Sequence, residues 1–322
     1  MQIIAYDFAK AFDRLRHDVI VERMMECGMP NELISWVANY LNDRKQCVKI
    51  GTICSKYCRV TSGVPQGSIL GPFLFSIVMG SLNISLKDCC VIKFADDVTI
   101  CAPIYHEQRN SLVKVAHDAV VDWSNRYHLP LNFGKCKTLL IRSSKECKLT
   151  HLPNVEVVES LKVLGVIFNQ RLSWSHHVDA ITKSASKRLF PLRLLRPNVN
   201  DLCLKITYYG LMRSVMEYAA PLFVGLSKTD SKKLESLQKR FHKLLCGPNC
   251  VKQCLTSLAE RRNMMATKLY RVAENDEHHV LFSILCHKSS SGRFIIPPVK
   301  TSRRLSSFSL KIALLLNENF SR

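Results

Sequence analysis

Residues 91–104 read Val-Ile-Lys-Phe-Ala-Asp-Asp-Val-Thr-Ile-Cys-Ala-Pro-Ile. β-Branched and aromatic residues stand on both sides of the tripeptide Ala95-Asp96-Asp97, which predicts strands over 91–94 and 98–104 joined as a hairpin. Asp96 and Asp97 then lie at the hairpin tip. Taken alone, an Asp-Asp pair is most often a plain turn or a helix cap, so its meaning depends on the residues around it.

Another carboxylate lies near the start of the chain. Residues 2–6, Gln-Ile-Ile-Ala-Tyr, predict a short apolar strand that is followed directly by Asp7. If this strand shares a sheet with the hairpin, Asp7, Asp96 and Asp97 approach one another and repel. Two divalent ions relieve such repulsion, because Mg²⁺ prefers oxygen ligands and a pair of ions can clamp both oxygens of a phosphoryl transfer. The three carboxylates are therefore a candidate metal site.

The rest of the pattern up to about residue 170 mixes helices and strands. Apolar spacing and turn signals predict helices over 18–27, 31–41, 69–86 and 106–128, a hairpin-like region over 46–60, a Gly- and Pro-rich loop over 62–71, and strands over 137–141 and 161–168. This order predicts an α+β fold rather than a doubly wound sheet. From residue 173 onward the pattern is almost entirely helical, with helices expected near 176–195, 201–217, 230–246 and 255–274.

The charge of the chain is strongly positive and unevenly distributed. Lys and Arg total 46 against 26 Asp and Glu, a formal net charge of +20. Residues 1–160 contain 19 basic and 16 acidic side chains, whereas residues 161–322 contain 27 and 10. A basic half of this kind is typical of a surface that binds a polyanion such as nucleic acid. A solvated basic face is the alternative interpretation.

The cysteines and the apolar stretches bear on the compartment. The 14 cysteines follow no repeated spacing and no signal peptide precedes them, which predicts reduced, buried thiols in an intracellular protein. The apolar stretch 69–86 contains Gly, Pro, Ser and Asn, so a buried helix is expected there and no membrane span. The sequence does not distinguish nucleus from cytoplasm, because Arg303-Arg304 is too short for a nuclear address.

Three motifs carry a resemblance to a known family. They are Ala5-Tyr6-Asp7-Phe8-Ala9-Lys10-Ala11-Phe12-Asp13, then Ser62-Gly63-Val64-Pro65-Gln66-Gly67-Ser68-Ile69-Leu70-Gly71-Pro72, and then Phe94-Ala95-Asp96-Asp97. In this order they resemble the first palm motif, the Gly-Val-Pro-Gln-Gly motif and the catalytic hairpin of reverse transcriptases from non-LTR (LINE-type) retrotransposons. Three specific motifs in the family's order make the resemblance strong.

Further segments agree with this resemblance. Leu131-Asn132-Phe133-Gly134-Lys135-Cys136-Lys137 is similar to the Asn-x-x-Lys segment that follows the hairpin. Leu164-Gly165-Val166 with Leu172-Ser173-Trp174 resembles the primer-grip strand and the entry to the thumb. Tyr218-Ala219 and the segment 234–240 resemble the thumb and connection helices of jockey-like elements.

The resemblance implies a right-hand polymerase architecture. It assigns residues 1–172 to a palm, an antiparallel sheet with flanking helices, and residues 173–288 to an all-helical thumb and connection region. Residues 289–322 are expected to form a basic, loosely docked C-terminal tail. The family carries a fingers region before the first palm strand, and often an endonuclease before that. We therefore expect an N-terminally truncated chain that holds only part of the palm.

The resemblance also assigns roles to individual residues. Asp7, Asp96 and Asp97 become the catalytic, metal-binding carboxylates, which hold two Mg²⁺ ions or, alternatively, Mn²⁺. The residues expected to bind nucleotide or template are Phe8, Phe12, Gln66, Gly67 and Lys135. Leu164 and Gly165 are expected at the primer grip. In the family, an aromatic ring at the position of Phe12 screens the 2′-carbon of the sugar.

The implied function is that of an RNA-directed DNA polymerase, a nucleotidyltransferase. Its partners would be an RNA template, a DNA primer and deoxynucleoside triphosphates, and no membrane. Two alternatives stay open. In the first alternative, the chain is a catalytically inactive remnant that at most binds nucleic acid, because the family's basic residues that hold the triphosphate lie in the fingers. In the second, the chain is a two-metal nuclease, which neither the Gln-Gly loop nor Phe12 supports.

Overall fold

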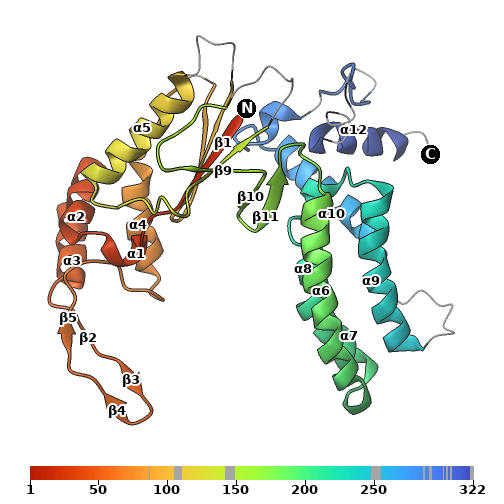
Figure 1. Cartoon of the computed structure of the whole chain (residues 1–322), viewed down its shortest axis with the longest axis horizontal. Helices are drawn as coiled ribbons and strands as arrows, with labels where there is room; N and C mark the ends of the chain where they lie inside the picture. The colour runs from red at the N-terminus through yellow and green to blue at the C-terminus, as the bar shows by residue number, and fades with distance from the viewer. Residues whose placement is uncertain are drawn as a thin grey trace. The chain divides into compact units, whose positions relative to one another are not determined.

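The computed structural model describes residues 1–86, 88–104, 111–141, 149–247, 255–285, 287–289, 292–299, 301, 304 and 307–319. These residues form a mixed α/β structure (Figure 1). The chain divides into two compact units, which are treated separately below. Unit 1 comprises Met1–Gly165 and Asn169–Arg171, and unit 2 comprises Val166–Phe168 and Leu172–Arg322.

Unit 1 contains a five-stranded sheet, short hairpin strands and five helices among its described residues. In chain order these elements are β1 (Gln2–Tyr6), α1 (Ala11–Arg14), α2 (His17–Glu26), α3 (Asn31–Leu41), β2 (Lys45–Gln46), β3 (Lys49–Ile50), β4 (Ile53–Cys54), β5 (Cys58–Arg59), α4 (Leu70–Gly80), β6 (Cys90–Phe94), β7 (Asp97–Ala102), α5 (Ser111–Arg126), β8 (Lys137–Leu140), β9 (Glu156–Val158) and β10 (Ser160–Val163).

The expected strand over residues 2–6 is confirmed as the centre of the sheet. The strand order is β6-β7-β1-β8-β9, and β1 pairs antiparallel with both β7 and β8. A central strand must be apolar on both faces, and Ile3, Ile4 and Tyr6 are buried. Gln2 is also buried, and its side-chain amide is satisfied because it donates to Thr138 Oγ1 and accepts from the Thr150 N–H.

One hydrophobic core joins the sheet to the helices of unit 1. Helices α2, α3 and α4 contribute buried side chains at helical spacing, and β1 and β7 contribute buried side chains from the sheet. The expected helix over 69–86 is shorter than the apolar stretch that suggested it, because α4 ends at Gly80. In the described part of the chain, no helix is long and apolar enough to cross a membrane.

Three expectations for the strands need correction. The strand expected over 161–168 is two strands, β10 and β11 (Val166–Asn169), because Leu164 and Gly165 both take positive φ values and form a tight turn. Strand β9 has no counterpart in the sequence-based prediction. It pairs in parallel with β8, so the sheet is mixed rather than purely antiparallel.

Among the described residues, no two cysteines form a disulfide. Cys136 is buried, as expected, but the expectation of buried thiols is wrong for most of the others. The exposed thiols are Cys27, Cys54, Cys58, Cys90 and Cys203. Three of these, Cys54, Cys58 and Cys90, lie on two-residue strands or on the edge strand β6, where a small side chain has no core to enter.

Unit 2 is helical apart from β11. Its described elements are α6 (Ser175–Leu195), η2 (Arg196–Asn198), α7 (Asp201–Tyr208), η3 (Tyr209–Arg213), α8 (Ser214–Met216), η4 (Ala220–Phe223), α9 (Lys228–Cys246), α10 (Leu258–Glu274), η5 (Phe282–Ile284) and α12 (Phe308–Asn319). Helices α7, α9 and α10 begin at capping side chains, Asn200, Ser227 and Ser257, each of which accepts a backbone N–H of the first turn.

The core of unit 2 packs α6, α7 and α9 together. Tyr208 and Phe241 are fully buried and stack with their ring centroids 3.9 Å apart. The helix expected over 201–217 is interrupted by η3, a π-helical turn at Tyr209–Arg213. Such turns insert an extra residue and re-aim the side chains that follow.

The last helix contradicts the expectation of a loosely docked tail for its described part. Ile312 and Ala313 of α12 are fully buried, and they form a small core with Tyr270 of α10 and with Phe294. Tyr270 and Phe294 meet edge to face at a centroid distance of 5.4 Å. The described part of the tail is therefore a packed element of unit 2.

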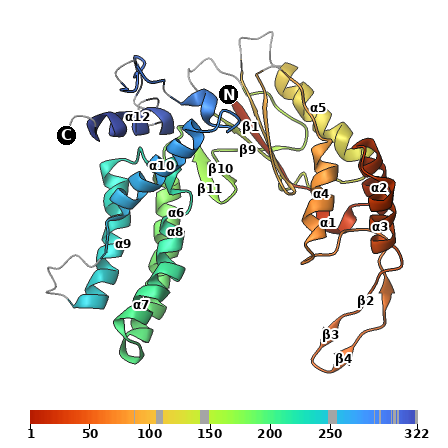
Figure 2. The ribbon, with the colours of Figure 1, turned by 180° about the vertical axis from the view of Figure 1, so that it is seen from behind.

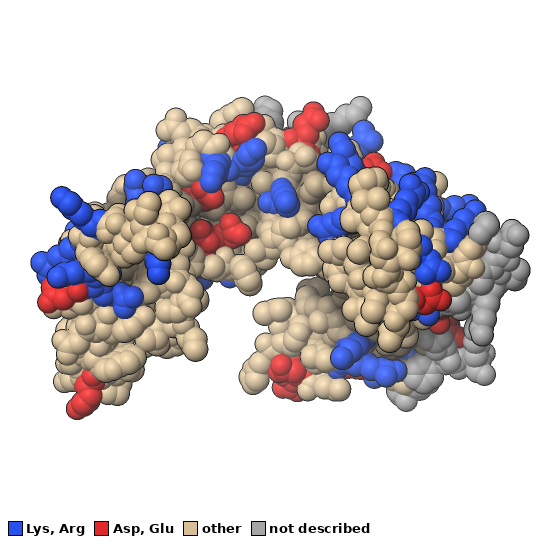
Figure 3. Space-filling view, turned by 90° about the horizontal axis from the view of Figure 1, so that it is seen from below, with Lys and Arg blue, Asp and Glu red and all other residues tan. Residues whose placement is uncertain are grey.

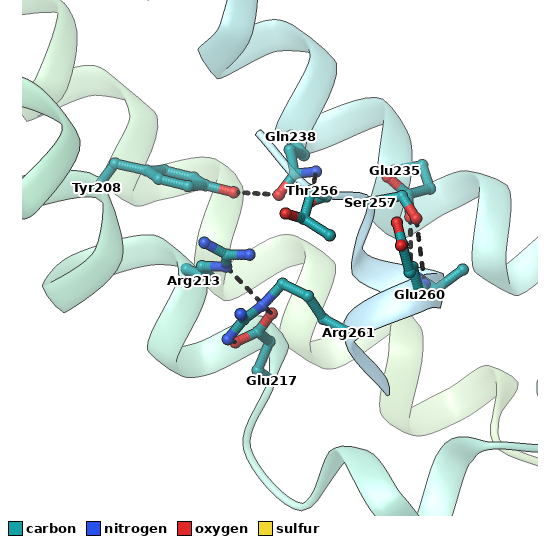
Figure 4. Close-up of polar contacts among 10 residues, drawn as sticks. Tyr208, Arg213, Glu217, Glu235, Gln238, Thr256, Ser257, Glu260 and Arg261 are labelled. Atoms are coloured by element: carbon teal, nitrogen blue, oxygen red, sulfur yellow. Dashed lines mark hydrogen bonds and ion pairs between the residues drawn. The ribbon is translucent and has the colours of Figure 1, made fainter. Parts of the chain in front are cut away.

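A network of charged side chains follows the π-helical turn (Figure 4). Glu217 accepts from Arg213 Nε at 3.1 Å and from Arg261 Nη2 at 2.9 Å, so it joins the π-turn segment to α10. The Glu217 side chain is only 14% exposed. Burial by itself would raise the pKa of Glu217, but the hydrogen bonds and charges of Arg261 and Arg213 outweigh it and hold the pKa below its ordinary value.

The Glu217→Gln variant is expected to destabilise unit 2 by about 2 kcal/mol at pH 7, because two arginines lose their shared counter-ion. Amide hydrogen exchange of α10, followed by mass spectrometry, should then accelerate by about 30-fold. A depressed carboxyl pKa stabilises the fold above its unfolded value and loses this effect as the pH falls through the folded pKa. The difference in stability between the wild type and Glu217→Gln should therefore become smaller below about pH 4. Equal exchange rates of α10 in the wild type and Glu217→Gln at pH 7 would contradict this stabilising role of Glu217. The matched control is Glu277→Gln, because Glu277 is exposed.

Candidate active site

The carboxylates lie at one edge of the sheet of unit 1. Phe94 pairs with Asp97 across the β6–β7 hairpin, and Ala95 takes a φ of 50° in the turn between them. Tyr6 of β1 and Val98 of β7 form the last pair of the β1–β7 register. Asp7 directly follows Tyr6, and Asp97 directly precedes Val98 on the neighbouring strand. The hairpin expected over 91–104 is confirmed, and Asp7 lies beside it.

The charges at this edge act on one another. Partial burial raises the pKa of Asp97, and the negative charges of Asp96 and Asp7 raise it further. Lys135 Nζ lies 3.6 Å from Asp7 Oδ2 and is the described cation that forms an ion pair with the cluster. Three carboxylates against one lysine leave a surplus of negative charge.

The side chains of Asp7, Asp96 and Asp97 are chemically suited to bind a divalent cation. All three offer carboxylate oxygens, the donors that Mg²⁺ and Mn²⁺ prefer. The negative charges of Asp96 and Asp7, which add to burial in raising the pKa of Asp97, are a repulsion that a cation would relieve. In the residues that the structure describes, no group of three or more His, Cys, Asp and Glu is already arranged to hold a metal ion. The donor set therefore fits, and the three carboxylates would have to close around an ion.

Lys135 is positioned by a tight turn after α5. The N–H of Asn132 donates to the Asp7 carbonyl at 2.7 Å, and the N–H of Lys135 donates to the Asn132 carbonyl at 2.9 Å. The turn is thereby tied to the residue whose carboxylate Lys135 contacts. The structure therefore brings the Asn-x-x-Lys segment next to Asp7.

Lys93 was not among the residues singled out in the sequence, yet it anchors the hairpin. Its Nζ donates to the carbonyls of Met79 and Leu82, at 3.1 and 3.0 Å, at the C-terminal end of α4. A lysine there also suits the helix dipole. Burial lowers the pKa of Lys93. A lysine in an exposed edge strand carries no sequence signal for this role.

The Gly-Val-Pro-Gln-Gly loop is clamped onto the turn that follows β1. The N–H of Gly63 donates to the Leu15 carbonyl, and the N–H of Val64 donates to the Phe12 carbonyl, at 2.7 and 2.8 Å. Gln66 Nε2 donates to Asp13 Oδ1 at 2.8 Å. The first and second motifs are therefore one structural piece, although 49 residues separate Asp13 from Ser62, whose hydroxyl donates to the Asp13 carbonyl.

Two further polar residues hold this loop, and the sequence did not single them out. His17 Nε2 lies 2.9 Å from the Gly63 carbonyl oxygen, and Asp13 accepts from Gln66. Asp13 is the last residue of the first motif, and His17 follows it by four residues. Neither contact has a signal in the sequence, because polar side chains at surface positions look the same.

The expected nucleotide- and template-binding residues occupy different environments. Phe12 is partly buried and stacks on Phe75, with centroids 4.3 Å apart. Gln66 and Gly67 are exposed just before α4, and Gly67 takes a φ of +79°. Phe8 is 3% exposed and packs edge to face on Trp123, so its side chain fills the core rather than a ligand site.

The expected primer-grip residues form the turn between β10 and β11. Leu164 is 38% exposed with a φ of 46°, and Gly165 has a φ of 83°. Gly tolerates this backbone conformation without strain, whereas Leu does not. A strained, exposed turn of this kind can present its backbone to a ligand.

Comparison with known proteins adds the deciding observation. Residues 2–168, which contain all of the site residues above, match the family described as Reverse transcriptase (RNA-dependent DNA polymerase). The chain belongs to the reverse transcriptase family. The resemblance found in the three motifs is thereby confirmed.

Curated relatives of this reverse transcriptase come from mobile elements. The probable RNA-directed DNA polymerase from transposon X-element of Drosophila melanogaster is 25% identical over 254 residues, 75% of this chain and 28% of that protein. The RNA-directed DNA polymerase from mobile element jockey of Drosophila funebris is 24% identical over 261 residues, 75% of this chain and 28% of the relative. The expected similarity to jockey-like elements is confirmed, and the matched region spans little more than a quarter of these relatives.

Among solved structures, telomerase from Candida tropicalis in complex with a fragment of telomeric RNA is similar to this reverse transcriptase. The two chains are 14% identical with a TM-score of 0.41, and the match covers 88% of this chain and 48% of the telomerase chain.

The Asp97→Asn variant is expected to raise the melting temperature of the metal-free protein at pH 7. When the pKa of a carboxyl is raised in the folded state, the fold loses stability as the pH rises through that pKa. Asparagine carries no charge, so the variant does not lose this stability. The melting temperatures of the wild type and Asp97→Asn should become equal below the ordinary pKa of aspartate, at about pH 3. Differential scanning fluorimetry with and without Mg²⁺ checks this, because the ion should stabilise the wild type more than the variant. A lower melting temperature for Asp97→Asn at pH 7 would contradict it.

Proposed function

We propose that this chain carries the palm, within unit 1, and the thumb and connection, within unit 2, of an RNA-directed DNA polymerase. The observation that carries the proposal is that Asp7 directly follows the Tyr6–Val98 pair while Asp96 and Asp97 directly precede Val98 on the neighbouring strand, inside the region that matches the family. The substrates would be an RNA template, a DNA primer and deoxynucleoside triphosphates.

Asp7 and Asp96 would hold two divalent ions, Mg²⁺ or Mn²⁺, with Asp97 assisting. When bound, the ions would supply the positive charge that favours attack of a primer 3′-hydroxyl on the α-phosphate of a nucleotide. Lys135, 3.6 Å from Asp7, would steady the departing pyrophosphate. No acid or base is otherwise required of the protein, since positioning and charge do most of the work in phosphoryl transfer.

Other residues would shape the nucleotide and template pocket. The ring of Phe12, held by its stack on Phe75, would exclude a ribose 2′-hydroxyl. Gln66 and Gly67 would contact the nucleotide or template from the loop before α4, where Gly67 permits a close approach of backbone. Leu164 and Gly165 would contact the primer through their turn.

The charge of unit 2 supports a nucleic-acid partner. Unit 2 contains 25 basic and 10 acidic side chains, and Figure 3 shows Lys and Arg gathered over its helical part. Each phosphate that a cation neutralises releases counter-ions, which gives affinity without base specificity. Such a surface fits a template–primer duplex whose sequence changes at every step of synthesis.

The deciding experiment is extension of a labelled DNA primer on an RNA template by the full chain with Mg²⁺ and deoxynucleotides. Elongated primer that requires the carboxylates would support the proposal. Template–primer binding without elongation would favour the remnant that only binds nucleic acid. Shortened primer or cleaved template would favour a two-metal nuclease.

A further inference from the structure

The hairpin formed by β6 and β7, which carries Asp96 and Asp97 at its tip, also contains two cysteines that face each other. Cys90 of β6 is the direct cross-strand partner of Cys101 of β7. Direct partners in an antiparallel pair lie on the same face of the sheet, with their Cα atoms about 4.5–5.5 Å apart. A disulfide requires a Cα separation of about 4.4–6.8 Å, so this strand pair suits the bond. Figure 2 shows the sheet around β1, the strand next to β7.

The two thiols are close enough to influence each other. Burial and the negative charge of the neighbouring Cys90 together raise the pKa of Cys101 to about 11. Cys90 is exposed, whereas Cys101 is half-buried. Reagents in solution therefore reach Cys90 first, while Cys101 remains a protonated thiol at neutral pH.

Cysteines on the other hairpins of unit 1 face different side chains. Cys54 is paired with Lys49, and Cys58 is paired with Gln46. Both cysteines are exposed, as Cys90 is. They share the exposure and the strand geometry of Cys90 but lie opposite side chains other than cysteine, so they are internal controls for its chemistry.

We propose that Cys90 and Cys101 are a site of reversible oxidation, at which a low-molecular-weight disulfide such as oxidised glutathione converts the two thiols into a cross-strand disulfide. Strand β6 lies at the edge of the described sheet, where it pairs with β7 on one side. Near the hairpin tip, Lys93 ties β6 to the end of α4. The disulfide would tie the other end of β6 to β7, and both strands that carry Asp96 and Asp97 would then be held together covalently.

The reaction balances with oxidised glutathione as the oxidant. The Cys90 thiolate attacks one sulfur of glutathione disulfide, the S–S bond breaks, and reduced glutathione leaves with the proton that Cys90 released. The new bond removes the Cys90 charge that had raised the pKa of Cys101. The Cys101 thiolate then attacks the Cys90 sulfur, and a second reduced glutathione leaves with the proton from Cys101. Two protein thiols are oxidised to one disulfide, and one glutathione disulfide is reduced to two thiols.

The proposal rests on the register of β6 and β7 and not on the proposed function, so its test requires no primer extension. The reduced full chain is incubated with excess oxidised glutathione at pH 8, the remaining thiols are blocked with N-ethylmaleimide, and tryptic peptides are identified by mass spectrometry. Trypsin cleaves after Lys93, between the two cysteines, so the disulfide appears as two joined peptides. We expect this cross-link in the native protein, whereas Cys54 and Cys58 should carry glutathione. In urea, the cross-link should lose its preference over other cysteine pairs, because the register is lost.

Two variants separate Cys90 from Cys89, which lies in the same tryptic peptide. Cys90→Ser should lose the cross-link. Cys89→Ser is the matched control and should keep it, because Cys89 packs against the core of unit 1. In the oxidised wild type, amide hydrogen exchange of β6 and β7 should be about tenfold slower than in Cys90→Ser treated in the same way. Circular dichroism and melting temperatures confirm that each variant folds.

Three results would overturn the proposal. The first is glutathione on Cys90 without a cross-link, which would make Cys90 an ordinary exposed thiol. The second is a cross-link that persists in Cys90→Ser or disappears equally in Cys89→Ser. The third is equal exchange of β6 and β7 in the oxidised wild type and in oxidised Cys90→Ser, which would show that no bond holds the two strands together.

Discussion

The Asp96→Asn variant is expected to extend a primer on an RNA template at least about 10³-fold more slowly than the wild type. Asparagine keeps the shape of the side chain and removes its charge, so it loses the oxygen donor that a divalent cation requires. Charge stabilisation by a bound ion is worth several kcal/mol, and about 4 kcal/mol corresponds to a thousandfold in rate. Asp7→Asn should lose a similar amount, because Asp7 lies on the strand next to the same hairpin.

Single-turnover extension at saturating primer and nucleotide measures this change in the chemical step. The matched control is Asp122→Asn, which removes an exposed carboxylate from α5. The metal-free melting temperature of Asp96→Asn shows whether the fold survives the change. Extension by Asp96→Asn within tenfold of the wild type would contradict a catalytic role for this carboxylate.

The edge of the sheet that holds Asp7, Asp96 and Asp97 could be predicted because local sequence patterns indicate the elements that form it. The strand 2–6 ends at Asp7, and the β-formers around Ala95-Asp96-Asp97 specify a hairpin. Both signals depend only on neighbouring residues, and a strand that is apolar on both faces must lie inside a sheet. Once β1 pairs antiparallel with β7, the carboxylates lie at one edge of the sheet, and no other sequence signal is needed.

What holds this edge in place could not be predicted in the same way. Lys93 contacts carbonyls of residues 79–82, and Asp13 contacts Gln66, so each link depends on how distant segments pack. The parallel strand β9 also depends on tertiary pairing with β8, because three residues carry too little pattern to be recognised. The tight turn at Leu164 and Gly165 was misread because the apolar run continues through it.

The same distinction applies in unit 2. The long helices α6 and α9 follow from their apolar periodicity, and α9 also begins at the capping residue Ser227. The π-helical turn at Tyr209–Arg213 does not, since one extra residue leaves the local composition unchanged. Its outcome is the contact of Glu217 with Arg213 and Arg261, a network between separate helices that periodicity cannot describe.

The Gly63→Ala variant is expected to destabilise unit 1 by about 3 kcal/mol. Gly63 has a φ of +88°, which costs an alanine roughly 1–2 kcal/mol. A Cβ there would lie 2.7 Å from the Asp13 carbonyl oxygen and 2.9 Å from the Asp13 Cα, and a backbone cannot move aside as a flexible side chain would. Overpacking of this kind adds about 1–3 kcal/mol.

Urea unfolding followed by tryptophan fluorescence measures this loss. Of the three tryptophans, Trp174 lies in unit 2, so a Trp174→Phe background leaves Trp36 and Trp123 to report on unit 1. Gly28→Ala is the matched control, because Gly28 has a φ of +67° and open space around a Cβ. It should cost about 1 kcal/mol, the backbone strain alone. Equal losses at the two positions would show that the Gly-Val-Pro-Gln-Gly loop is not clamped on Asp13, and that Gly63 is required for its backbone conformation only.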